Sequence, residues 1–121
     1  MYPPIFATCS AVSAVTTMIG TSPVRLYPFG EAPQGVPLPY VVWQSVYGSP
    51  ENVIDGAPTI DQYTIQVDCY AATGTTARAV AQAMRDAIQT SAHIVGWRGE
   101  SRDVETGHYR YSFDVDWYVS R

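Results

Sequence analysis

The residue types that most often carry out catalysis or bind metals are few in this sequence and scattered along it. It contains two histidines, His93 and His108, and two cysteines, Cys9 and Cys69. None of them has further cysteine, histidine or carboxylate residues at the spacing of a zinc site. His108 is expected in a solvated turn and His93 near a helix end, and the cysteines are typical of small buried side chains in a reducing compartment. We therefore expect no metal and no cofactor.

Asp114 and Asp116 form the most regular pair of carboxylates in the chain. Residues two apart on a strand point to the same face of a sheet, so the two side chains are expected to lie on one side. Such a pair can perform general acid–base catalysis when its surroundings separate the two pKa values. No nucleophile or base accompanies it, and the sequence predicts no enzyme. The solvated face of a strand is the simplest interpretation, and a face toward a lumen or partner is the other.

The composition limits the classes of partner. The net charge is −4, and all seven basic residues are arginine. Because no basic run is present, the sequence lacks the electrostatic footprint of an open nucleic-acid-binding surface. A negatively charged channel through which DNA slides is compatible with this charge. Charged residues make up only 15% of the chain, which predicts that other copies or partners cover part of its surface.

The N-terminal segment has no basic region of the kind that opens a secretory signal, and no stretch approaches about 18 consecutive apolar residues. We therefore expect a protein that is made and used in a cytosol without contact with a membrane. Its 121 residues are expected to form a single domain over residues 1–121.

Hydrophobic periodicity predicts the order helix, strands, helix, hairpin. The expected helices cover residues 4–19 and a segment from an N-cap at Thr73 or Thr75 to about Thr90. The expected strands cover residues 24–28, 40–47, 60–70, 93–105 (broken at Gly96 and Gly99) and 109–119, with a loop over 48–58. This order predicts an α+β fold with two layers, a mainly antiparallel sheet and two helices packed on one of its faces.

A proline-rich stretch, "GEAPQGVPLPYVVW" at residues 30–43, leads into the second expected strand. Each proline restricts its own φ and biases the preceding residue toward an extended conformation. A stiff connector loses little entropy when it docks, which favours a role in a contact between subunits. The alternative is a loop held rigid for the stability of the single chain.

Several segments in order resemble the tail completion, or tail terminator, proteins of long-tailed bacteriophages and prophages. They are "RLYP", "APQGVPLPYVVWQ", a loop with an apolar pair, "IQVDCYA", "ARAVAQAMRDAI" and a last strand "YSFDVDWYV", and together they span about residues 24–119. The resemblance implies an α+β fold and a structural role without catalytic residues. Such proteins form a ring, usually of six copies, that caps the completed tail tube, stops its polymerisation and offers a surface to the head–tail connector.

The resemblance also implies the partners and the location. The expected partners are further copies of the chain, the tail tube protein, the connector, and genomic DNA that passes through a lumen without specific binding. The expected location is the neck end of the tail in the virion, after assembly in the cytoplasm of a bacterial host. The candidate interface residues are Pro33, Gln34, Pro37, Pro39, Glu51, Asn52, Val53, Ile54 and Asp55, and the candidates for a channel wall are Asp114 and Asp116.

Three other interpretations stay open at this stage. The chain could be another neck or head-completion protein of the virion. It could be a small-ligand-binding α+β module, which would need an apolar pocket with convergent polar groups that the sequence does not indicate. A toxin or inhibitor encoded by a prophage is also compatible with the composition.

Overall fold

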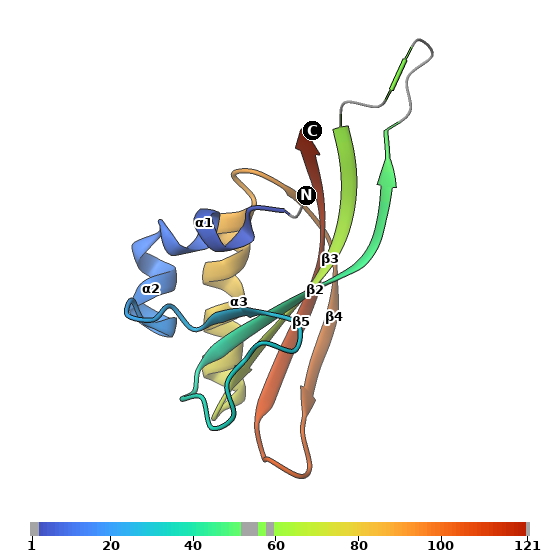
Figure 1. Ribbon diagram of the computed structural model, residues 1–121. Coiled ribbons are helices and arrows are strands. Elements are labelled where there is room, and N and C mark those ends of the chain that lie inside the picture. The colour runs from blue at the N-terminus through green and yellow to red at the C-terminus, as the bar shows by residue number, and fades with distance from the viewer. Residues whose placement is uncertain (1–2, 52–55, 58–59, 121) are drawn as a thin grey trace.

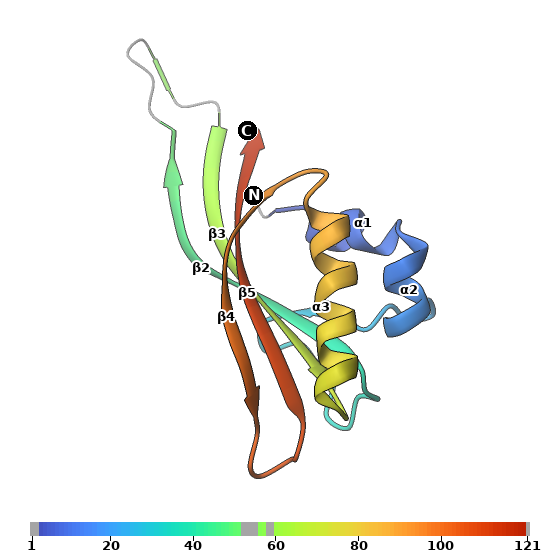
Figure 2. The same ribbon diagram turned by 180° about the vertical axis from the view of Figure 1, so that it is seen from behind.

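Five strands form one sheet, and three helices cover one of its faces (Figures 1 and 2). The computed structural model describes residues 3–51, 56–57 and 60–120. In chain order the elements are α1 (Ile5–Ser10), α2 (Ser13–Ile19), β1 (Leu26–Pro28), β2 (Tyr40–Pro50), β3 (Ile60–Ala71), α3 (Gly74–Ile88), β4 (His93–Arg102) and β5 (Tyr109–Ser120).

The strands lie in the order β1-β2-β3-β5-β4. β1 pairs with β2 in parallel, and every other neighbouring pair is antiparallel. β3 and β5 form the longest uninterrupted ladder, from Ile60 opposite Ser120 to Ala71 opposite Tyr109. The expected α+β fold with a mainly antiparallel sheet is therefore confirmed.

The core lies between the helices and one face of the sheet. Alternation along β3 and β5 turns Ile65, Val67, Phe113 and Val115 toward the helices, and all four are fully buried. Burial of one such side chain stabilises a fold by about 1.5–3 kcal/mol, so this face holds the two layers together. α3 lies against β3, β4 and β5, and α1 and α2 pack beside it (Figure 2).

The expected N-terminal helix is divided into two, so the structure has three helices where the sequence predicted two. Val12 has extended backbone angles, and its N–H donates to the carbonyl of Cys9 over 3.1 Å. The buried positions explain the break, because α1 buries Ile5 and Cys9 whereas α2 buries Val15 and Ile19. Val15 lies six positions after Cys9, which would put the two on different sides of one continuous helix. None of the described helices is long and apolar enough to cross a bilayer.

Several strand boundaries differ from the prediction. β4, expected over residues 93–105, ends at Arg102, and β1, expected from residue 24, begins at Leu26. β2 continues to Pro50, so residues 48–50 are strand and not the start of a loop. The pairing of Ser49 with Gln62 compensates for the Gly and Pro content that favoured a loop. In β4 the predicted breaks at Gly96 and Gly99 coincide with shifts in register against β5, and Gly99 has a φ of 93° that favours glycine.

The two thiols should be protected in the native protein. Burial raises the pKa of Cys9 to about 12 and also raises that of Cys69, so both stay protonated and inaccessible near neutral pH. We expect a maleimide to label neither thiol of the native protein at pH 7 and both after denaturation, as counted by mass spectrometry. Rapid labelling of either thiol in the native state would contradict the burial of these side chains.

The first turn of α3 supplies a measurable stabilisation. Thr73 is the N-cap, and its Oγ1 accepts a hydrogen bond from the backbone N–H of Thr76 over 3.2 Å. Thr73→Ala should lower the free energy of unfolding by about 1 kcal/mol. Thr75→Ala, at an exposed position inside the same turn, is the matched control and should change it by less than about 0.5 kcal/mol. Equal losses in denaturant titrations of the two variants would refute the capping role.

Candidate functional site

None of the described helices covers the face of the sheet opposite α1, α2 and α3 (Figures 1 and 2). The residues that β3 and β5 turn to this face are mainly polar. The alternation that buries one side of β3 and β5 turns the other residues of both strands to this side. Across the ladder Thr64 lies opposite Asp116, and Asp68 lies opposite Ser112. We call the following set the polar face: Gln62, Thr64, Gln66, Asp68, Ser112, Asp114 and Asp116.

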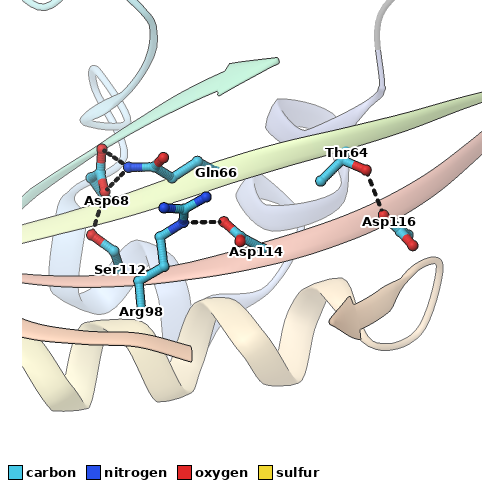
Figure 3. A network of polar contacts seen from close by, with 7 residues as sticks. All are labelled: Thr64, Gln66, Asp68, Arg98, Ser112, Asp114 and Asp116. Carbon is cyan, nitrogen blue, oxygen red and sulfur yellow. Dashed lines mark hydrogen bonds and ion pairs between the residues drawn. The ribbon is translucent and has the colours of Figure 1, made fainter. Parts of the chain in front are cut away.

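Hydrogen bonds tie the polar face together (Figure 3). Thr64 Oγ1 donates to Asp116 Oδ1 over 2.7 Å, and Gln62 Nε2 donates to the same oxygen over 3.0 Å. Gln66 Nε2 donates to Asp68 Oδ1 over 3.0 Å, and Ser112 Oγ donates to that oxygen as well. These bonds hold the side chains in fixed positions.

Burial on this face is high for a side that no helix covers. Gln62, Asp68 and Ser112 are buried although they belong to the polar face. Within the described part of the chain, no buried side-chain nitrogen or oxygen lacks a partner. Since an unpaired buried polar group costs about 1–3 kcal/mol, the network is needed for these residues to be tolerated there.

Asp114 and Asp116 lie on the same face, as their spacing predicts, but they have different partners. Asp114 Oδ1 accepts a hydrogen bond from Arg98 Nε over 2.8 Å, whereas Asp116 accepts from Thr64 and Gln62. The same contact with Asp114 raises the pKa of the Arg98 guanidinium. The two carboxylates share no hydrogen bond, so the arrangement does not resemble a dyad that shares one proton.

The proline-rich stretch forms the connection from β1 to β2 and borders a hollow of about 360 Å³. Pro33, Gln34 and Pro37 are exposed, whereas Pro39 is partly buried. The carbonyl of Pro39 accepts a hydrogen bond from Arg25 Nε over 2.9 Å, which anchors the end of the stretch to the body of the protein. These positions leave three of the four side chains accessible to a partner, and the interface role stays a prediction.

Tyr40, Tyr70 and His108 line the same hollow with their rings. The rings of Tyr40 and Tyr70 stack with centroids 5.0 Å apart, and the ring of His108 meets Tyr40 edge-on at 6.5 Å. Burial, with Tyr70 and Asp103 nearby, raises the pKa of the Tyr40 hydroxyl. His108 therefore contacts an aromatic ring at the base of the β4–β5 hairpin, where the sequence predicted a solvated turn.

The second group of predicted interface residues lies between β2 and β3 in the sequence. Glu51 is exposed, and its backbone N–H donates to the carbonyl of Ile60 over 2.9 Å. The other members of the group, Asn52, Val53, Ile54 and Asp55, lie outside the described residues. Their role in assembly stays a prediction.

The remaining titratable residues do not gather into a metal site in the part of the chain that the structure describes. No three His, Cys, Asp or Glu side chains there are placed to hold an ion together. His93 is the first residue of β4, where its ring meets Tyr118 edge-on with centroids 6.3 Å apart. It does not cap α3, whose C-cap is Gln89.

Sequence reasoning identified the two carboxylates but missed the residues that bond to them. The available signal is the alternation along residues 60–70, where Thr64, Gln66 and Asp68 take every second position. Nothing local indicated that this strand pairs with β5 rather than only with its neighbours in the sequence. Arg98 was missed because it is an extra residue at the register shift between Trp97 and Gly99.

The network can be tested at one buried hydroxyl. Ser112→Ala removes a donor to Asp68 and leaves the buried carboxylate with Gln66 alone. We expect the free energy of unfolding to fall by about 1–3 kcal/mol. Ser120→Ala is the matched control, because Ser120 is exposed at the end of the same strand and should change stability by less than about 0.5 kcal/mol. Urea titrations that give equal values for the two variants would exclude a stabilising network.

The fold resembles one in a solved particle. A chain from a structure described as the virion of a native gene transfer agent particle superimposes with a TM-score of 0.64 and is 23% identical in sequence. The superposition covers 97% of this chain and 92% of that chain, so the two proteins share one fold over nearly their whole lengths. None of the curated proteins compared with the chain matches it in sequence.

Sequence comparison with protein families identifies the chain more directly. The match to the family described as tail completion protein gp17 extends over residues 3–120 and so includes every helix and strand of the fold. The resemblance inferred from the ordered segments over residues 24–119 is thereby confirmed and extended to the N-terminal helices. The chain belongs to the tail completion protein gp17 family and is a structural protein of the virion tail or neck.

Proposed function

We propose that the protein caps the tail tube as a ring, ends polymerisation of the tube and offers a joining surface to the head–tail connector. Family membership supports a place in the tail. The structural observation that carries the proposal is the polar face, a broad side of the sheet whose polar groups are already bonded to one another. A surface of this kind suits the wall of a water-filled channel, because it needs no protein partner to satisfy its polar groups.

The charge of this side of the sheet agrees with a channel for DNA. The described charged side chains on this side of the sheet are three carboxylates and two guanidiniums: Asp68, Asp114, Asp116, Arg98 and Arg110. Each copy therefore contributes an excess of one negative charge. Repeated around a ring, and with the net charge of −4 in each chain, the wall repels phosphates and lets DNA slide without binding. Asp114 and Asp116 are in this proposal residues of the channel wall.

The partners follow from the same arrangement. Other copies of the chain complete the ring, the tail tube protein lies on one side of it, and the head–tail connector lies on the other. We assign these contacts to the exposed prolines of the β1–β2 connection and to Glu51 with the four residues that follow it in the sequence. The similarity in fold to a chain of a gene transfer agent virion supports a location in the virion.

The ring can be tested by light scattering on the purified protein, alone and mixed with the tail tube protein of the same virus. We expect a species with six times the monomer mass of 13.3 kDa in at least the mixture. A ring that forms only on the tube is compatible with the proposal, because each interface is small and closure is cooperative. A strict monomer that does not bind the tube protein in either sample would refute the ring.

Electron microscopy of particles that lack the protein separates a terminator from another neck component. Loss of a terminator leaves the tube free to polymerise, so tails longer than normal are expected. Loss of a head-completion or connector protein would instead give DNA-filled heads without tails, and the tails would keep their normal length. Supply of the intact gene in trans is the control and should restore normal tails in both cases.

A further inference from the structure

Among the described strands the sheet has two open edges, the outer edge of β2 and the outer edge of β4. β1 pairs only with Val41–Trp43, so the outer edge of β2 has no strand beside it from Gln44 to Pro50 in the described chain. At the other side of the sheet, β4 has β5 on one side and no described strand on the other. An unpaired edge of this length offers a row of backbone donors and acceptors to another strand.

Exposed apolar side chains gather along both edges. On or beside the β2 edge, Phe29 is 70%, Val46 45% and Tyr47 62% exposed. On β4, Val95 is 58% and Trp97 43% exposed. Edge strands of single-chain proteins are commonly protected by charged or proline residues, which here are Pro50 at the end of β2 and Arg98, Glu100 and Arg102 in the second half of β4. The apolar side chains at the other positions indicate a contact with another protein.

The directions of the strands allow the two edges to pair with each other in different copies. From β2 to β3, from β3 to β5 and from β5 to β4 the direction reverses each time, so β2 and β4 run antiparallel. A second copy placed beside the first in the same orientation therefore brings its β2 antiparallel to β4 of the first copy. Antiparallel pairing is the arrangement already used by the rest of the sheet.

The open stretch of β2 and the start of β4 also lie at the same height along the strand direction. Ile94 pairs with Val115, Val115 pairs with Ile65, and Ile65 pairs with Ser45. Ile94 and Ser45 therefore lie at the same level along the strands, at opposite edges of the sheet. The residue that follows each of them, Val95 in β4 and Val46 in β2, is the extra residue of a register shift and is exposed. If copies are related by a rotation without a shift along the strands, Ile94 of one chain faces Ser45 of the next, and Val95 lies within two residues of Val46 along the strands. Residues 97–101 of β4 then lie at the level of Tyr40–Trp43, where β1 borders β2, so the start of β4 is the part that can pair with the open edge.

Charge supports contact between unlike edges over contact between like edges. Glu31 is exposed in a hollow of about 560 Å³ that Phe29, Trp43 and Ser45 also line beside the β2 edge. β4 carries Arg98, which bonds to Asp114 of its own chain, Glu100, which bonds to Arg78, and the exposed Arg102. A β2 edge offers Arg102 the carboxylate of Glu31, which favours contact between unlike edges.

We propose that the copies associate head to tail, with the open edge of β2 at residues 44–47 in one copy paired antiparallel with the outer edge of β4 at residues 93–96 in the next. The inference rests on the proposed ring and adds the surfaces that build it. Unlike edges that meet in this way form a heterologous interface, which closes into a ring when the rotation fits. The sheets then become continuous around the ring, with the polar face on one side and all three helices on the other.

The test is chemical cross-linking of two single-cysteine variants in the full-length protein. Val46→Cys and Val95→Cys each add one exposed thiol, and the native Cys9 and Cys69 are buried. A bismaleimide that spans roughly 7 Å tolerates a stagger of two residues between neighbouring strands. We expect cross-linked dimers when the two variants are mixed with the tail tube protein, and at least tenfold fewer with either variant alone.

A third variant controls for exposure. Val104→Cys is 94% exposed in the β4–β5 turn, away from the level of Val46, and its mixture with Val46→Cys should not cross-link above background. Circular dichroism spectra of the three variants should match that of the unchanged protein, because all three positions are exposed. The double variant Val46→Cys/Val95→Cys should give a ladder of products that ends at the size of the ring.

The outcomes separate this inference from the ring itself. A sixfold mass by light scattering without cross-links between Val46→Cys and Val95→Cys would overturn the edge pairing and leave the ring intact. Dimers from Val95→Cys alone would also overturn it, because they indicate pairing of like edges. A monomer under every condition, with and without the tube protein, would overturn both proposals.

Discussion

The antiparallel ladder between β3 and β5 is the constraint on which the rest of the structure depends. It lies at the middle of the sheet and aligns the alternation of two long strands, so that one face is mainly apolar and the other mainly polar. The helices must cover the first face to bury Phe113 and its neighbours. The second face can remain uncovered only because its polar groups bond across the same ladder, as Thr64 does with Asp116.

The alternation of polar and apolar residues within each strand made the two faces of the sheet predictable from the sequence. It indicated β3 and β5, and it indicated that Asp114 and Asp116 share a side. Pairing between strands is a different kind of information, because it depends on which segments distant in the chain approach each other. The partners of Asp114 and Asp116, which are Arg98, Thr64 and Gln62, could not be inferred until the order β3-β5-β4 was known.

The errors in element boundaries also have a physical cause. Residues 4–19 contain apolar positions compatible with one helical stripe, and only packing against the sheet selects a break that buries both Cys9 and Val15. Residues 48–50 have weak strand propensity, yet pairing with β3 keeps them in the sheet. In both cases tertiary contacts outweigh a local preference of a few tenths of a kcal/mol per residue.

The polar face and the open edges of the sheet differ in how much they gain from contact with another protein. A face whose donors and acceptors are already bonded gains little from a protein partner, whereas an unpaired edge with exposed Val46 or Val95 gains backbone hydrogen bonds and buried apolar area. Association is therefore favoured within the plane of the sheet and not across it. One pair of strands is a small interface, so a short row of copies is weakly held, and only closure gives every copy two neighbours. In the proposed ring, a tube end that aligns the copies would lower the entropy lost on closure, and assembly is then expected where the tube has been completed.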